Sequence, residues 1–293
     1  ERLVFMSDTS TTILPEGFVA QSVDESGRVS IAVHDHVAIV TFDRADKRNA
    51  LDGHQFAAIE AAGAKLKTMG DVRVVVLHGA GASFCAGLDF SGFSAMAGDG
   101  SDMGDDPNSP GRLTESGLTH LGQQVCWVWQ ELEVPVIAAM QGHALGGGLQ
   151  IALGADIRVA HPDTQLSVRE VHWGIIPDMT GTHILDRLVR PDVARELTYT
   201  ARVLDAREGA DIGLITKLSE TPLDDALSIA REIAGRNPHA IRASKRLLSS
   251  SFTQGAGAQF AAERSEISAL VGTPNQIEVI QANLEKRVPV LHD

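Results

Sequence analysis

Three consecutive glycines, Gly146–Gly148, lie between an apolar run at residues 134–140 and a helix-like run at residues 149–153. Glycine has no Cβ, so a ligand can approach its backbone, and the free N–H groups at the start of a helix favour negative charge. A second turn of small residues, 78–90, follows another apolar run at residues 71–77. If the two turns face one point, they supply two backbone N–H donors, which an acyl oxygen needs when it becomes an enolate or a tetrahedral oxyanion. A tight turn that requires a positive φ explains the three glycines equally well.

The elements that must position these turns alternate between strands and helices at first and are largely helical later. Short runs rich in β-branched residues predict strands, and apolar residues at helical spacing predict helices. The strands are expected at residues 29–33, 37–42, 71–77, 134–140, 156–160 and 165–168. The helices are expected at residues 52–69, 118–132, 149–153, 182–189, 192–199, 206–212, 223–235, 238–251, 260–270 and 275–287. Residues 169–178 contain Gly174 and Pro177, which predict a loop at the edge of the sheet.

The composition is that of an ordinary globular chain and argues against several classes of function. Of 293 residues, 43% are hydrophobic and 22% are charged. The formal net charge of −13 argues against a surface for nucleic acid or anionic lipid. No apolar run approaches the roughly 20 residues that a membrane helix requires. Two cysteines, Cys85 and Cys126, without a signal-peptide pattern favour a cytoplasmic location and no disulfide framework.

No metal site is expected. His34–His36 separates two predicted strands and is interpreted as a hairpin turn, because no third cluster of metal ligands stands at a suitable spacing. The aspartates at 99, 102, 105 and 106 belong to a loop rich in glycine and serine, and their spacing does not fit a calcium-binding loop.

Several ordered motifs between about residue 28 and residue 290 resemble the crotonase superfamily, also called the enoyl-CoA hydratase/isomerase family. They are Asn49–Leu51, Ser83–Asp89, Gln141–Gln150, Ala155–Arg158, Gly174–Pro177 and Leu284–Arg287. The resemblance implies an α/β fold, a spiral of β-β-α repeats followed by a C-terminal helical region. On this basis residues 1–27 form a flexible leader, residues 28–200 the spiral core and residues 201–293 a helical trimerisation region. A homotrimer or a dimer of trimers is expected.

The resemblance also implies how a substrate binds. The backbone N–H groups of Leu88 and Gly147 correspond to the oxyanion hole that holds a thioester carbonyl. Cys85 and Ala86 correspond to the surroundings of the coenzyme A adenine. Basic residues associated with its phosphates correspond to Arg44, Lys47, Arg48 and Lys286. The expected partner is an acyl-CoA thioester, and no separate cofactor is expected because coenzyme A enters as part of the substrate.

The carboxylates distinguish the activities of this family. Its hydratases use two glutamates, of which the second corresponds to Glu170, whereas the first position holds Gln150. An amide has no titratable proton near neutral pH, so Gln150 can hydrogen-bond a water or a substrate but cannot act as base or acid. Asp178 lies eight residues after Glu170, and this pair resembles the acid and base of dienoyl-CoA isomerases. Those enzymes also place an acidic residue at the position of Gln150, so the match is incomplete.

Purely structural roles remain open for the same residues. Asp178 fits the N-cap of the helix that contains Thr182, and Glu170 fits a surface ion pair with Arg169 or Arg158. His143, His172 and Cys85 are interpreted as structural residues rather than bases or nucleophiles.

The sequence therefore predicts an acyl-CoA isomerase in which Glu170 is the principal base and Asp178 a second acid. One alternative is an enoyl-CoA hydratase in which Gln150 orients a water that Glu170 activates. The other is a non-catalytic acyl-CoA-binding protein.

Overall fold

Two sheets of mixed strand direction form the framework of the computed structural model, which describes residues 14–89 and 108–293. The strand order is β1-β2-β3-β4-β5-β7-β10 in the seven-stranded sheet and β6-β8-β9 in the three-stranded sheet. The strands are β1 (Gln21–Ser22), β2 (Val29–His34), β3 (Val37–Phe42), β4 (Val74–Gly79), β5 (Val136–Met140), β6 (His143–Leu145), β7 (Ile157–Ala160), β8 (Gln165–Ser167), β9 (Leu204–Asp205) and β10 (Lys217–Leu218).

The helices lie between and after these strands. They are η1 (Ala45–Lys47), α1 (Gly53–Lys67), α3 (Leu121–Glu131), α4 (Gly147–Leu153), η2 (Glu170–Trp173), α5 (Gly181–Leu188), α6 (Pro191–Thr200), α7 (Ala206–Asp211), α8 (Pro222–Ala234), α9 (Pro238–Ser250), α10 (Ala256–Leu270) and α11 (Pro274–Glu285). None of the helices in residues 14–89 and 108–293 is both long enough and apolar enough to cross a membrane.

The predicted hairpin at residues 29–42 is confirmed. β2 and β3 pair antiparallel, with Val29 opposite Phe42 and His34 opposite Val37. Asp35 and His36 connect them with φ angles of 45° and 65°. A two-residue turn with positive φ at both positions matches the twist of the flanking strands. His34–His36 is thus the turn of this hairpin, as predicted.

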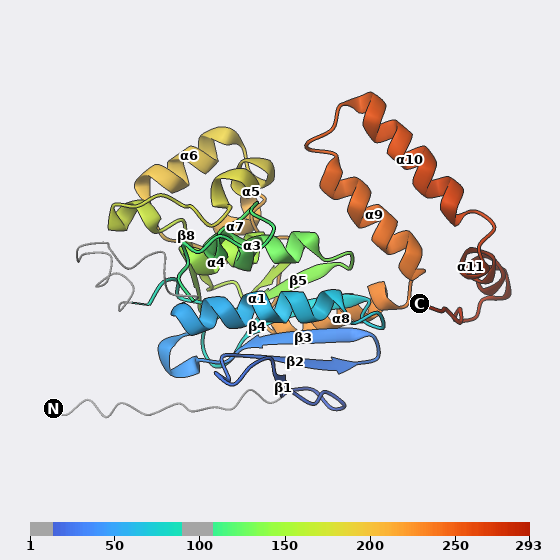
Figure 1. The fold of residues 1–293 in the computed structure, drawn as a ribbon, viewed down its shortest axis with the longest axis horizontal. Coiled ribbons are helices and arrows are strands. Elements are labelled where there is room, and N and C mark those ends of the chain that lie inside the picture. The colour runs from blue at the N-terminus through green and yellow to red at the C-terminus, as the bar shows by residue number, and fades with distance from the viewer. Residues whose placement is uncertain (1–13, 90–107) are drawn as a thin grey trace.

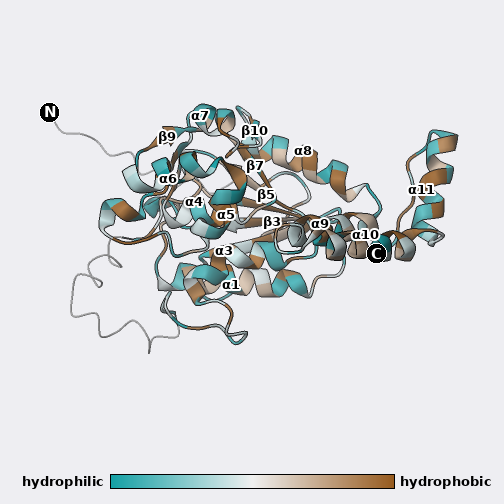
Figure 2. Cartoon of the chain, turned by 90° about the horizontal axis from the view of Figure 1, so that it is seen from above, coloured by the Kyte–Doolittle hydropathy of each residue, from teal (hydrophilic) through white to brown (hydrophobic). Residues whose placement is uncertain are grey.

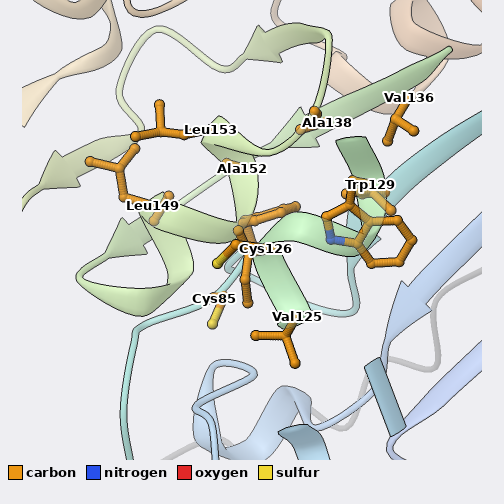
Figure 3. Packing of buried hydrophobic residues seen from close by; sticks show 14 of the residues in the cluster. Cys85, Val125, Cys126, Trp129, Val136, Ala138, Leu149, Ala152 and Leu153 are labelled. Carbon is orange, nitrogen blue, oxygen red and sulfur yellow. The ribbon is translucent and has the colours of Figure 1, made fainter. Parts of the chain in front are cut away.

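The seven-stranded sheet is covered on both faces, which explains why its central strands are apolar throughout. Successive side chains of a strand point to opposite faces. Val75 and Leu77 of β4 accordingly pack into a core with α1, α3 and α4, whereas Val74 and Val76 pack against α8. Figure 3 shows part of the first core, where Cys85 and Cys126 lie among aliphatic side chains and near Trp129. Every residue of β3, β4 and β5 is buried.

The last three helices extend away from the sheets in Figures 1 and 2. α9 is fastened to the core by Lys245, whose Nζ donates to the carbonyl oxygens of Trp129 and Val134 at 3.0 and 2.8 Å. The same nitrogen lies 2.9 Å from Asp156 Oδ2. α10 lies beside α9 but has no buried residue. α9 is therefore anchored to the core, and so is the chain end, where Arg73 Nε donates to Asp293 Oδ1 at 2.7 Å, whereas α10 between them is exposed.

The predicted elements are present, with shifts at their ends and some additions. β6 separates β5 from the glycine turn, and α4 already begins at Gly147 rather than after the glycines. The predicted loop at 169–178 contains η2. The predicted helical region 201–293 also contributes β9, β10 and α8 to the sheets and their cover. The leader up to residue 13 and the aspartates at 99–106 lie outside the described residues.

Candidate active site

The triple glycine forms the start of α4. Gly146 has φ 52° and ψ −122° and is the N-cap, and its own N–H donates to the carbonyl oxygen of Ser167 at 2.9 Å. A φ of this sign favours glycine. The chain then turns into α4, so the N–H groups of the first helical turn point out of the helix start. The triple glycine is therefore both a tight turn with positive φ and the exposed N-terminus of a helix, the two roles predicted for it as alternatives.

The second glycine turn lies against the first. Cys85 N–H donates to His143 O at 2.9 Å, and Leu145 N–H donates to Cys85 O at 3.1 Å. Gly87 has φ 92°, and a Cβ at this position would lie 2.6 Å from Leu145 O. The absence of a side chain at Gly87 therefore allows the two turns to touch.

Leu88 and Gly147 consequently line the same cavity, which has a volume of about 980 Å³. Within the described part of the chain, no carbonyl accepts a hydrogen bond from the N–H of either residue. Two unpaired N–H groups on one cavity wall form the arrangement that holds an oxyanion. The remaining wall is mainly apolar, and it includes Phe56, Leu145, Trp173, Ile175, Ile176 and Met179.

Glu170 is the buried carboxylate of this cavity, with 6% of its surface exposed. Its pKa is raised from 4.5 to about 7, mainly by burial. The negative charge of Asp178 contributes to this rise, whereas hydrogen bonds, including one from Gln150, oppose it. Glu170 Oε1 accepts from Gln150 Nε2 at 2.5 Å, and Oε2 has no hydrogen-bond partner among the described residues. A carboxylate with this pKa takes up and releases a proton near neutral pH.

Gln150 is held on both sides of its amide. Its Oε1 accepts from Met179 N–H at 3.0 Å and from Gly181 N–H at 2.9 Å. It is 1% exposed and does not line the cavity, in contrast to Glu170. This geometry gives no support to the predicted contact between Gln150 and the substrate.

The structural alternatives for Asp178 and Glu170 do not match the observed contacts. The N-cap of α5 is Thr180, with φ 69° and no side-chain cap, while Asp178 is exposed on the cavity wall. The guanidinium of Arg169 donates to Ala201 O, and that of Arg158 donates to Leu214 O and Ala155 O. Within the described residues neither arginine forms an ion pair with Glu170.

Comparison with known proteins agrees with this geometry. The family model described as enoyl-CoA hydratase/isomerase matches residues 33–293. The short-chain enoyl-CoA hydratase of Clostridium acetobutylicum is 32% identical over 266 residues, which cover 90% of this chain and 97% of that protein. The chain belongs to the enoyl-CoA hydratase/isomerase family.

Other members of this family are similarly close. The crotonyl-CoA hydratase of Syntrophomonas wolfei is 32% identical over 257 residues, covering 86% of this chain and 92% of that protein. The crystal structure of an enoyl-CoA hydratase from a Polaromonas species has a TM-score of 0.81 at 26% identity, over 90% of this chain and 99% of that one. The crotonase-like fold expected from the sequence is therefore confirmed. The chain is an enzyme of this superfamily, a hydratase or an isomerase with an acyl-CoA substrate, which leaves the non-catalytic alternative without support.

The residues predicted to bind coenzyme A do not all reach the cavity. Lys47, Arg48 and Ala86 line it. Arg44 does not, because its guanidinium is paired with Asp89 Oδ2 at 2.6 Å and with Asp52 Oδ2 at 3.4 Å.

Cys85 and Lys286 also lie off the cavity wall. Cys85 is fully buried, and burial raises the pKa of its thiol to about 12, so it packs as a neutral side chain. Lys286 is the C-cap of α11 and lies on the C-terminal helices.

His120, which is not among the residues predicted from the sequence, lines the cavity at the start of α3. Its Nδ1 accepts from Gln123 N–H at 3.2 Å, and Gln123 Oε1 accepts from His120 N–H at 3.1 Å. This reciprocal cap is analogous to the capping box, in which a serine or threonine and a glutamate or glutamine are usual. The three-residue spacing of His120 and Gln123 indicates the start of a helix, but it does not indicate that His120 lines a cavity.

Proposed function

We propose that this enzyme moves a carbon–carbon double bond of an enoyl-CoA or dienoyl-CoA thioester, with Glu170 as the base. The observation that supports the proposal most strongly is the difference between Glu170, which can exchange a proton, and Gln150, which cannot. Glu170 is buried, has a pKa of about 7 and has one oxygen without a hydrogen-bond partner among the described residues. Gln150, at the position of the other hydratase glutamate, has no proton to exchange. One base is sufficient for a proton shift along an acyl chain.

In the proposed reaction the thioester carbonyl accepts hydrogen bonds from the N–H groups of Leu88 and Gly147. Glu170 Oε2 removes a proton from the carbon next to the carbonyl or from the carbon beyond the double bond. The electrons of the broken C–H bond pass into the conjugated system and the carbonyl oxygen becomes an enolate, which the two N–H donors stabilise. Return of the proton to a different carbon shifts the double bond. Asp178 lines the same cavity and is proposed as a second acid for shifts between distant carbons.

Hydration of an enoyl-CoA is the second candidate, and the names of relatives favour it. Both curated relatives described above are named hydratases, at 32% identity. In this candidate Glu170 activates a water for addition to the double bond, without a second glutamate. The geometry gives it less support because the oxygen of Gln150 is occupied by two backbone donors and is not available to accept from a water.

A panel of thioesters tests the two candidates. A 3-enoyl-CoA should gain conjugated absorbance as its double bond moves, whereas crotonyl-CoA should lose absorbance only slowly by hydration. Glu170→Gln should reduce isomerisation by about 10²- to 10⁴-fold and leave acyl-CoA binding intact. Glu208→Gln, which alters an ion pair with Arg202 away from the cavity, is the matched control. Rapid hydration of crotonyl-CoA with no isomerisation would contradict the proposal and support the second candidate.

We propose further that coenzyme A phosphates bind near Lys47 and Arg48, beside Ala86, because these residues line the cavity. For the C-terminal helices we propose assembly with other copies of the chain, as the family resemblance implies. The support is the exposed apolar side chains on and directly after α10 and on α11: Phe260, Ile267, Val271, Ile277, Ile280 and Leu284. We propose that they form one apolar surface, which is typical of an interface.

A further inference from the structure

The amide of Gln150 makes three hydrogen bonds, and together they leave it one orientation. Two backbone N–H groups, of Met179 and Gly181, approach one end of the amide. A backbone N–H can only donate, so this end must be the carbonyl oxygen Oε1. The NH₂ group therefore faces Glu170 Oε1, which lies 2.5 Å from Nε2. Rotating the amide by 180° would oppose donors to donors.

The surroundings of Gln150 leave it no freedom to change these contacts. The side chain lies on α4, is 1% exposed, and all residues of this helix are buried. Gly181 is close enough that a Cβ there would lie 2.5 Å from Gln150 Oε1. The amide of Gln150 is thus held by hydrogen bonds between the start of α5 and the carboxylate of Glu170.

We infer that Gln150 is a positioning residue, which occupies Oε1 of Glu170 and leaves Oε2 as the only oxygen that receives the substrate proton. This inference rests on the proposed role of Glu170 as base. Oε2 is the buried oxygen without a partner among the described residues, and Glu170 lines the cavity. A carboxylate whose two oxygens are distinguished in this way presents a single lone-pair direction to the substrate, which pre-organises proton transfer. Gln150 thereby acts through Glu170 and not by touching the substrate.

The same hydrogen bond affects when Glu170 is ionised. A donor to a carboxylate favours the charged form and lowers its pKa. The titratable groups whose charges interact with Glu170 are Asp178, in the loop after η2, and Cys126 of α3. Burial raises the pKa of the Cys126 thiol well above its usual value, so it stays neutral and Asp178 is the charged neighbour. The charged residues elsewhere on the cavity wall are Lys47, Arg48, Asp89 and Arg169. Loss of the donor at position 150 should therefore raise the pKa of Glu170.

Two substitutions at position 150 and one control test this role. Gln150→Met keeps the size of the side chain and removes both donor and acceptor. Gln150→Glu keeps an acceptor for the N–H groups of Met179 and Gly181 but places a carboxylate against Glu170. The control is Gln130→Met on α3, where the lost contact is a hydrogen bond from Nε2 to Gly154 O at 2.6 Å, away from the cavity.

For both variants at position 150 we expect the acid limb of the kcat/KM profile to move to higher pH by about one unit or more. We also expect kcat to fall by about 10- to 100-fold while KM stays nearly constant, because orientation and not binding is lost. Gln130→Met should keep the position of the acid limb. An unchanged acid limb in both position-150 variants would overturn the inference.

A second measurement separates this inference from the proposed reaction. The pKa of Glu170 can be followed without substrate by ¹³C NMR of labelled glutamate carboxyls, with the Glu170 signal assigned by its absence in Glu170→Gln. The inference predicts an upward shift in Gln150→Glu whichever reaction the enzyme catalyses. If that shift is present but no thioester isomerises, the proposed function fails and the hydrogen-bonding role stands. If the enzyme isomerises thioesters but Glu170 titrates as in the unaltered protein, the positioning role fails.

Discussion

The core around α4 and the C-terminal helix α10 place similar small and apolar residues in opposite environments. All seven residues of α4 are buried, whereas α10 has none buried in its fifteen. Both helices contain glycine close to their start. At Gly148 an added Cβ would lie 2.2 Å from Cys85 O, whereas at Gly257 it would have no neighbour within 4 Å.

The carboxylates of the two regions have pKa values shifted in opposite directions. Burial raises the pKa of Glu170 to about 7. The hydrogen bonds from Arg287 lower the pKa of Glu278, a half-buried residue of α11, to about 2. The core thus holds its backbone and the Glu170 carboxylate under constraints set by close neighbours, whereas α10 has few such neighbours within this chain.

Gly148→Ala should destabilise the protein by about 3 kcal/mol or more, because the new methyl group meets a backbone carbonyl that cannot move without separating the two glycine turns. The measurement is the free energy of unfolding in urea. A loss of less than about 1 kcal/mol would show that the turns can shift apart and that the core is less constrained than proposed.

Glu170→Gln should stabilise the protein at pH 8, because it removes a buried negative charge. The folded-state pKa of about 7 lies above the ordinary value of 4.5, so the folded state binds the proton more tightly than the unfolded state. The stability that protonated Glu170 gives to the unaltered protein is fully present below pH 4.5 and is lost as the pH rises through 7. The loss amounts to at most about 3 kcal/mol, from the difference between the two pKa values.

Thermal unfolding of both proteins between pH 4.5 and pH 8 checks this effect. The difference in melting temperature should grow with pH in favour of Glu170→Gln. A constant difference would mean that Glu170 titrates at its ordinary pKa. Glu278→Gln is the comparison from the C-terminal region. It should alter the dependence little in this range, because the folded-state pKa of about 2 and the ordinary value of 4.5 both lie at or below its lower end.

Phe260→Glu on α10 should reduce the size of the assembly in solution and change the unfolding of an isolated chain little. Phe260 is 55% exposed, so a charge there meets water within one chain but would be buried at the proposed interface. Sedimentation velocity measures the assembly, and Ser265→Glu on the same helix is the control for added charge. If Phe260→Glu sediments as the unaltered protein does, α10 is not at the interface.

Gly257→Ala should stabilise the protein slightly, by about 0.5 kcal/mol, because alanine restricts the unfolded chain and favours the helix. It reverses the sign expected for the same substitution at Gly148. Urea unfolding of the two variants side by side checks the contrast. A clear loss of stability in Gly257→Ala would show that α10 has a close neighbour at this position.

Local sequence was sufficient for much of the fold. The hairpin at His34–His36 follows from two β-branched runs around a short polar turn. Asp52 caps α1 as predicted, because its Oδ1 accepts a hydrogen bond from Gln55 N–H at 2.8 Å. The ends of elements were less predictable: β6 is only three residues long, and α10 begins at Ala256 although apolar periodicity is clear only from residue 260. A strand this short is stabilised by pairing with its neighbours, so its own residues do not distinguish it from a loop.

The sequence by itself determined the two glycine turns, the carboxylate at position 170 and the missing acid at position 150, because backbone freedom and the presence of a titratable group are properties of single residues. Only the tertiary structure decided what those residues do. It paired Arg44 with Asp89, buried Cys85 away from the cavity wall, and directed the amide of Gln150 toward Glu170. These outcomes depend on burial and on contacts between residues 20 or more positions apart, and such contacts leave no periodic signal in the chain.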